Sequence, residues 1–418
     1  MTSIVTKLTS KYLIEVVLLI GLIIAVPLLE APKNIFWLAY CITWLFNRFK
    51  DKNFGGQWDI WDSLIFTWIV SGYVISAFAG MHSSEWGGAN DILRYGSILW
   101  LIKRSGYQRN ELMWLGFTVI TSTLIALTYA FWALYVSHTR QLLELNSVGH
   151  VNHSAIYMAI SFGVALSYTL ALWKKLGIIG RLLGTLCIVL FAVAVLISAS
   201  RAAVAMAIVF AIILGIAWVK RSGKSGILLL VGIMCVVAGA YFAKIDVVKK
   251  QEAVAKENRL LTGRDQIWHS AIVAWKEFPL FGVGMHNYNQ ISMEKVQTWV
   301  EASGKPFDPS YYLGSAHGHS LFFTALAERG AIGLSVLVTI LLSWLYTLIR
   351  FRPKIQDEDI EWALWGSSLS AWLVNVGVGF VNTTLHHEHG ILSATLLGMW
   401  LAYLHLKKQN VSTTTTAK

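Results

Sequence analysis

Residues 316–333 read AHGHSLFFTALAERGAIG and join a polar stretch of the chain to an apolar run at 331–349. Working outwards, the polar stretch reaches back to about Lys244, so that residues 244–330 form one long insert rich in Arg, His, Trp and Gly. The rest of the chain consists of apolar runs with short connections. Binding and catalytic residues gather on loops that a rigid scaffold holds in place. The sequence therefore predicts a membrane scaffold with its chemistry in this insert and at the spans beside it.

The composition excludes a soluble domain. Of the 418 residues, 56% are hydrophobic and only 14% are charged, which is typical of polytopic membrane proteins. Cys41, Cys187 and Cys235 all lie inside apolar runs, so they predict neither a disulfide framework nor a metal site. Most of the Lys and Arg behind the net charge of +11 form short clusters between apolar runs, as the positive-inside rule describes. We therefore expect membrane lipids, and no nucleic acid, as partners.

Twelve apolar runs are long enough to cross, or nearly cross, the hydrocarbon. The second and fourth are short, which leaves ten or eleven full crossings open. The fold class predicted is an all-α polytopic membrane protein with about twelve transmembrane helices. Its divisions are helices one to nine in 1–243, a partly helical periplasmic insert in 244–330, helices ten to twelve in 331–406, and a disordered cytoplasmic tail in 407–418. The twelve runs are 12–29, 35–47, 60–79, 91–102, 112–136, 155–173, 182–199, 202–219, 226–243, 331–349, 361–381 and 390–406.

The orientation follows from the basic residues of the short loops. With a cytoplasmic N-terminus, twenty of the 34 Lys and Arg fall on the cytoplasmic side. Both termini are then cytoplasmic, and the insert and eleven of the 12 histidines lie at the outer face. Histidine is the side chain best matched to proton transfer near neutral pH. The pattern predicts a functional site on the outer face of a multi-pass membrane protein.

Two arginines are candidates for binding an anion. Arg201 lies between two apolar runs with almost no loop, where an Arg costs about 2.5–3.5 kcal/mol and needs a partner or an anionic ligand. The alternative is an interfacial Arg that extends its side chain to water. Arg264 follows Thr262-Gly263, which the pattern predicts as a helix start, and Trp268 shares its helix face. Because guanidinium groups bind phosphate oxygens in a bidentate way, Arg201 and Arg264 would suit a diphosphate.

His317 and His319 flank a glycine just before the tenth span. A metal site there would need two further ligands, and one histidine acting as a general acid or base with the other positioning the substrate fits better. We therefore expect neither a metal nor a cofactor. The further ligands available at the outer ends of the last two spans are His386, His387, Glu388 and His389.

A second polar run, residues 146–154, lies at the outer end of the sixth span. His150, Asn152 and His153 in this run are candidate substrate contacts, and so is Trp268 in the insert. The alternative for the run is a helix cap supplied by Ser154 or Asn152. The sequence leaves both open.

At this point the motifs match a family. Arg201, Thr262-Gly-Arg264 with Trp268, Gly282-Val-Gly284 and the stretch 319–334 together resemble the O-antigen ligase and polymerase superfamily. The His-Asn pair that usually begins the last motif of this family is His319-Ser320 here. The resemblance extends over most of residues 140 to 340, and its specificity comes from the motifs taken together.

The resemblance implies a metal-independent, inverting glycosyltransferase of the inner membrane of a Gram-negative bacterium. Such an enzyme transfers O-antigen polysaccharide from undecaprenyl pyrophosphate to lipid A-core on the periplasmic face. Under this resemblance Arg201 and Arg264 bind the diphosphate, His319 takes the acceptor proton, and His317 assists. A lipid pyrophosphate donor also suits a compartment that holds no ATP.

Three other functions compete. An O-antigen polymerase shares the donor and the motifs, and a protein O-oligosaccharyltransferase belongs to the same superfamily but usually has a longer C-terminal region. A transporter, from a different class, would also have about twelve spans. It would, however, place polar groups near the bilayer midplane, whereas the polar groups here gather at one face.

Overall fold

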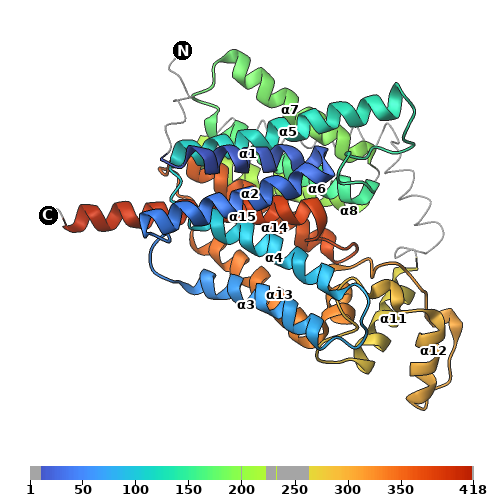
Figure 1. Cartoon of the computed structure of the whole chain (residues 1–418). Coiled ribbons are helices and arrows are strands. Elements are labelled where there is room, and N and C mark those ends of the chain that lie inside the picture. Colours follow the sequence, from blue (N-terminus) through green and yellow to red (C-terminus); the bar gives the residue numbers. More distant parts are fainter. Residues whose placement is uncertain (1–10, 199, 223–231, 233–262, 417–418) are drawn as a thin grey trace.

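The computed structural model describes residues 11–198, 200–222, 232 and 263–416, and all regular structure within these ranges is helical. Figure 1 shows long helices packed side by side, with α11 and α12 at one end of the bundle. Two short 3-10 helices, η1 (Tyr288–Gln290) and η2 (Pro309–Tyr311), lie near them. The α-helices are α1 (Leu13–Leu28), α2 (Glu30–Asp51), α3 (Ile60–Ala77), α4 (Glu85–Lys103), α5 (Arg109–Tyr135), α6 (Val151–Leu172), α7 (Ile178–Ile197), α8 (Arg201–Ser222), α11 (Arg264–Glu277), α12 (Met293–Ala302), α13 (Leu321–Arg350), α14 (Asp359–Gly379) and α15 (His387–Thr416).

Eleven of the twelve predicted apolar runs coincide with helices, and the ninth, 226–243, lies outside the described residues. Among the described helices, 7 are long and apolar enough to cross a membrane, and the chain is a multi-pass membrane protein. The two short runs lie in longer helices, α2 and α4, whose polar flanks continue the helical hydrogen bonding. Residues 407–416, predicted as part of a disordered tail, continue α15. Lys407 contacts Glu361 at 2.8 Å, which holds the helix beyond its last apolar turn.

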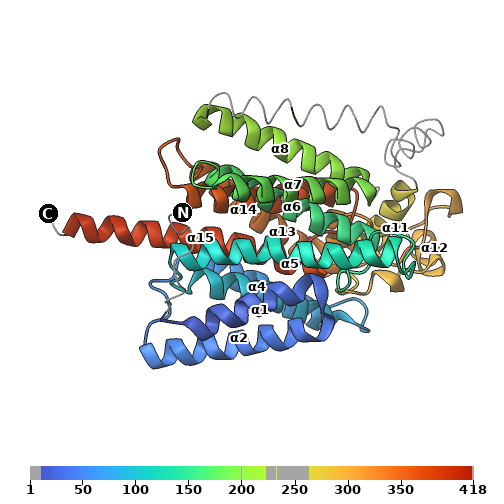
Figure 2. The same ribbon diagram turned by 90° about the horizontal axis from the view of Figure 1, so that it is seen from above.

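The interior of the bundle is built around α6, whose residues from Ser154 to Leu172 are all buried. It packs against α5, α7, α8 and α14, as the view in Figure 2 shows. Two glycines let α6 and α14 approach closely: a Cβ on Gly163 would lie 1.8 Å from Ser370 Oγ, and a Cβ on Gly366 would lie 2.4 Å from Ser167 Oγ. Small residues at such contacts are the usual means of packing helices in membranes.

The described part of the insert has its own small core. The apolar faces of α11, η1 and α12 meet there, together with one residue from the first turns of α13. The core is therefore continuous with the start of a spanning helix, which couples the insert to the bundle. Its buried members are Ile267, Ala271, Ala274, Val283, Tyr288, Ile291, Val296, Val300 and Ala327.

A break in α13 attaches the insert to the bundle through backbone groups. Gly330 has φ 59° and ψ −165°, so the N–H groups of residues 331 and 332 cannot reach the carbonyls of residues 327 and 328. All four groups bond instead to residues 279–284. The bonds are Val283 N–H to Ala327 O (2.8 Å), Gly284 N–H to Glu328 O (3.0 Å), Ala331 N–H to Pro279 O (2.8 Å) and Ile332 N–H to Leu280 O (3.2 Å).

Glycine is required on both sides of this junction. A Cβ on Gly330 would lie 2.3 Å from Leu280 O, and a Cβ on Gly282 would lie 2.5 Å from Ala327 O. Both glycines also have positive φ, which residues other than glycine rarely adopt. Gly282 and Gly330 therefore allow the two backbones to come together.

The two ends of the bundle differ in their polar groups. At the end where α15 finishes, basic side chains of several helices pair with carboxylates, and we call this the basic end. At the opposite end, seven histidines gather where α6, α13 and α15 begin, and we call it the histidine end. The basic-end pairs include Arg48–Glu15 (3.2 Å), Lys103–Asp62 (2.9 Å), Arg104–Asp62 (2.8 Å), Lys175–Asp359 (2.8 Å) and Lys407–Glu361 (2.8 Å). The histidines of the histidine end are His150, His153, His317, His319, His386, His387 and His389.

Candidate functional site at the histidine end

The loop 315–320 carries two of the predicted catalytic residues. Trp268 of α11 donates a hydrogen bond from Nε1 to Gly318 O at 3.1 Å, and its ring stacks on Phe323 at 4.9 Å. A Cβ on Gly318 would lie 2.7 Å from Thr324 Oγ1, so a larger residue would displace the loop. The half-buried Trp268, predicted as a substrate contact, therefore holds the loop against α11 and α13.

Ser320 fixes the start of α13. Its hydroxyl accepts a hydrogen bond from Phe323 N–H at 3.4 Å and donates one to Gly379 O at 3.1 Å, and its side chain is buried. Serine and asparagine are both strong N-cap residues. The departure from the usual His-Asn pair thus keeps the capping function and leaves His319 in place.

His317 and His319 lie side by side, with ring centroids 4.6 Å apart, and both are half-buried. His319 has φ 44°, an uncommon conformation for a residue with a side chain. Burial lowers the pKa of both imidazoles, and for His319 it acts together with the positive charges of His317, Arg264 and His150 to bring the pKa to about 4. His319 is therefore neutral, and able to accept a proton, across the whole neutral range.

Arg264 and Arg201 lie within electrostatic reach of each other. Arg264 is the first residue of α11 and follows Gly263, which has φ 79°, while Thr262 lies outside the described residues. Burial lowers the pKa of the Arg264 guanidinium, and the charge of Arg201 at the start of α8 adds to this. Because Arg264 also acts on His319, the structure brings together two arginines and an imidazole that are far apart in the sequence. Their predicted roles remain predictions.

The start of α6 resolves the alternatives for the second polar run. His150 is the N-cap residue, and its Nδ1 accepts a hydrogen bond from Asn152 N–H at 3.2 Å. Ser154 lies inside the helix, where its hydroxyl accepts from Leu145 N–H at 2.9 Å and holds the preceding loop. His150 therefore supplies the cap. The sequence suggested Ser154 or Asn152 for this role, and neither of them supplies it. His150 is exposed and Asn152 is half-buried, so contact with a substrate remains a prediction for both.

His153 points elsewhere. Its Nδ1 lies 3.2 Å from His389 Nε2, and its ring centroid lies 4.5 Å from that of His386. The sequence had grouped His386 and His389 only as possible partners of His317 and His319. A repeat of three histidines within four residues at 386–389 was the available signal, but nothing in the sequence said that α6 would face it.

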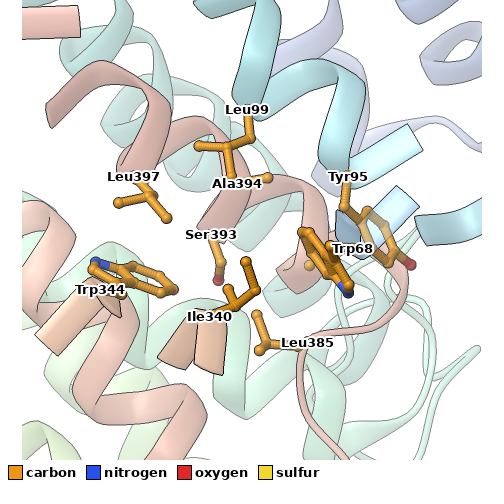
Figure 3. A pocket seen from close by; sticks show the side chains of 10 residues that line it. Trp68, Tyr95, Leu99, Ile340, Trp344, Leu385, Ser393, Ala394 and Leu397 are labelled. Carbon is orange, nitrogen blue, oxygen red and sulfur yellow. The ribbon is translucent and has the colours of Figure 1, made fainter. Parts of the chain in front are cut away.

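The pocket shown in Figure 3 is lined by other side chains, although Leu385 and Gly390 of its lining adjoin His386 and His389 in the chain. It is small and apolar, and it lies among α3, α4, α13 and α15 within the bundle. Trp68, Trp344 and Leu397 are among its lining side chains. None of the arginines or histidines named above lines this pocket, so we place the candidate chemistry at the histidine end.

Comparisons with known proteins agree with the motif pattern. The family model described as "O-Antigen ligase" matches residues 186–338, a segment that contains Arg201, Arg264 and His319. The "Exopolysaccharide production protein ExoQ" of Rhizobium meliloti (strain 1021) is 32% identical over 134 residues. This match covers 31% of the present chain and 28% of the relative, so the likeness concerns one part of each protein.

Proposed function

Because the chain belongs to the O-antigen ligase superfamily, we propose that it transfers O-antigen polysaccharide from undecaprenyl pyrophosphate to lipid A-core. In this proposal the enzyme lies in the bacterial inner membrane, with both termini cytoplasmic and the histidine end in the periplasm. The observation that carries the proposal is the convergence of Arg201, Arg264 and His319 at one end of the bundle.

The two arginines would bind the diphosphate of the donor. Each lies at the start of a helix, where unpaired backbone N–H groups favour an anion. Guanidinium groups keep their charge when partly buried, so Arg201 and Arg264 would stabilise the negative charge that develops on the leaving group. This arrangement supports a reaction that needs no metal at the diphosphate.

His319 would act as the general base. The acceptor hydroxyl attacks the anomeric carbon from the face opposite the diphosphate, and a new glycosidic bond forms with inversion. The bond from the anomeric carbon to the phosphate oxygen breaks, its electrons leave with undecaprenyl pyrophosphate, and the hydroxyl proton passes to His319. His317, 4.6 Å away between ring centroids, would orient the base or the acceptor.

The low pKa of His319 suits this cycle. A base with a pKa of about 4 is neutral before the donor binds, but it has little driving force for taking a proton. A bound diphosphate offsets the positive charge of Arg264 and Arg201, which raises the pKa of His319 towards neutrality. Donor binding would thus strengthen the base at the moment when it is needed.

A two-substrate assay tests the proposal. Purified protein in lipid nanodiscs receives lipid-linked O-antigen with and without lipid A-core, and products are separated by gel electrophoresis. We expect polysaccharide on lipid A-core only when both lipids and the native His319 are present. His138→Ala, at an exposed residue, is the control and should transfer at the native rate. If His319→Ala transfers at the same rate as this control, His319 is not the base.

A polymerase is the second candidate, because the matched relative is named for exopolysaccharide production. A polymerase would use the same donor site and the same base but would take another lipid-linked saccharide as acceptor. Longer chains formed from lipid-linked O-antigen alone, with no transfer to lipid A-core, would decide for the polymerase.

A further inference from the structure

Three histidines at the histidine end form a cluster that the proposed transfer reaction does not use. His153 comes from the first turn of α6, His386 from the turn before α15, and His389 from the first turn of α15. One ring nitrogen of each lies within 4.8 Å of the other two. Three imidazoles that converge in this way from two distant parts of the chain are a potential set of metal ligands.

The spacing of the cluster fits a small tetrahedral ion. Zinc binds imidazole nitrogen at about 2.0–2.1 Å, so two nitrogens of a tetrahedral site lie roughly 3.4 Å apart. His153 Nδ1 and His389 Nε2 are 3.2 Å apart. The ring centroids of His386 lie 4.5 Å from His153 and 4.8 Å from His389, so a small rotation of the His386 ring completes a three-nitrogen face.

The cluster is short of hydrogen-bond partners. Nε2 of His386 is buried and has no partner among the described residues, and His389, whose Nε2 faces His153, is 0% exposed. Buried ring nitrogens normally have a partner, because an unsatisfied polar group is costly. A metal ion would satisfy one nitrogen of each ring at once. The neutral imidazole that burial favours is also the form that binds metals.

The backbone holds the turn before α15 in an unusual conformation. Leu385 and His387, on either side of His386, have φ 55° and 47°, values that residues other than glycine rarely adopt. Glu388 is buried and is paired with Lys33 of α2, which anchors the same turn. This strained turn directs His386 and His389 towards α6 at a cost to the stability of the fold.

We propose that His153, His386 and His389 bind one divalent transition-metal ion, with Zn²⁺ the best match, and that this ion ties α6 to the start of α15. Imidazole ligands suit Zn²⁺ and other late transition metals, whereas Mg²⁺ and Ca²⁺ prefer oxygen. A water molecule would take the fourth position. His319 is not a ligand, so this site is separate from the proposed base and stands whether or not the chain transfers glycans. It departs from the expectation of a metal-free protein.

The first test uses the native protein without a polyhistidine tag. The protein is stripped with a chelator, incubated with Zn²⁺ or Co²⁺, and passed through a desalting column. We expect one equivalent of Zn²⁺ per chain by mass spectrometry, and with Co²⁺ the intense visible absorption of a tetrahedral site. Metal content well below one equivalent, with no such absorption, would overturn the proposal and leave a hydrogen-bonded histidine cluster.

Variants locate the ion. His153→Ala, His386→Ala and His389→Ala should each weaken Zn²⁺ binding by at least about 100-fold, since even the loss of an outer-shell partner costs 10–100-fold. His405→Ala is the matched control, because His405 lies towards the other end of the same helix and should leave binding unchanged. Zn²⁺ should also raise the Tm of the native protein and not that of His153→Ala. Full binding in all three variants would contradict the assignment.

Discussion

The basic end and the histidine end hold their charged groups in opposite ways. At the basic end, Arg104 binds Asp62 through two nitrogens, at 2.8 and 2.9 Å, and also donates to the carbonyls of residues 56 and 57. At the histidine end, the charged groups that act on His319 are His317, Arg264 and His150, all of them basic. The basic end is neutralised by the protein itself, whereas the surroundings of His319 at the other end gather groups of like sign.

This difference separates structural charge from functional charge. A buried ion pair with its hydrogen bonds complete offers nothing to a ligand, and its role is to hold helices together. Basic groups that lower each other's pKa are costly for the fold, and an anionic ligand relieves that cost. The comparison therefore identifies the histidine end as the region to alter when activity is measured, and the basic end as the region to alter when stability is measured.

The largest expected effect is the loss of the base. His319→Ala should lower the rate of transfer by about 10²–10⁴-fold, the usual contribution of a general base. The initial rate with both lipids in excess measures it. His317→Ala should cost less. Equal losses for the two variants would mean that they act as one unit and would revise their division of roles.

At the basic end the expected effect is on stability. Arg104→Gln removes the bidentate partner of Asp62 and leaves it Lys103 alone, so the cost should be below the roughly 3–5 kcal/mol of a fully broken buried pair. We expect a lower unfolding temperature in detergent, while the folded fraction keeps native activity per molecule. The exposed pair Arg109–Glu358, at 2.8 Å, supplies the control, since Arg109→Ala should change stability by less than about 1 kcal/mol.

Arg264→Ala should lower transfer by roughly 10²–10³-fold, as the loss of one donor to a developing anion does. Arg264→Lys keeps the charge but loses bidentate geometry, so it should also be impaired. The matched control is Arg140→Ala, because Arg140 binds Glu144 O at 2.6 Å in a loop away from α11. A fully active Arg264→Lys variant would show that charge alone suffices.

The pH profile of kcat/KM gives a smaller effect. Since His319 has a pKa of about 4 in the free protein, its neutral form persists as the pH falls and is lost only near that value. For an ordinary histidine of pKa about 6.5, the neutral fraction at pH 5 would be roughly 30-fold smaller than at high pH. We expect kcat/KM to hold down to about pH 5. A decline centred near pH 6.5 would show that burial and the neighbouring charges do not lower the pKa of His319.

The smallest effect concerns the loop 315–320. Trp268→Phe keeps an aromatic ring against Phe323 but removes the hydrogen bond to Gly318 O, worth about 0.5–1.5 kcal/mol. Transfer should fall by at most about tenfold, and Trp268→Ala should cost more. If Trp268 instead binds the glycan, the Phe variant should raise KM for the donor or acceptor and leave kcat unchanged.

The helices could be predicted from the sequence, because long apolar runs must either be buried in the protein or cross the membrane. The positions of α2 and α4 were readable too, but not their lengths. Their polar flanks look like loops until partners such as Glu388 for Lys33 are known. Residues 407–416 were expected to form part of a tail, and α15 continues through them; the contact between Lys407 and Glu361 joins residues 46 positions apart.

The candidate site was partly readable. His317, His319, Arg201 and Arg264 carry motif information, and the structure brings them together. His153 was assigned to the substrate because its neighbours in the sequence suggested it, whereas its nearest ring partners come from 386–389. The glycines at 282 and 330 belong to the motifs of the family resemblance, and the structure shows that each is needed for a contact between backbones. Neither the histidine cluster nor the backbone junction can be recognised from residues that are neighbours in the sequence.

The junction between residues 279–284 and 327–332 also bears on how such a protein changes over generations. Its hydrogen bonds join main-chain atoms, so they survive replacement of nearly every side chain except the two glycines. The outward surface of α12 and its neighbouring loops can thus accumulate substitutions while its attachment point stays fixed. Variation of the insert's surface and permanence of its attachment to the bundle are compatible in one chain for this reason.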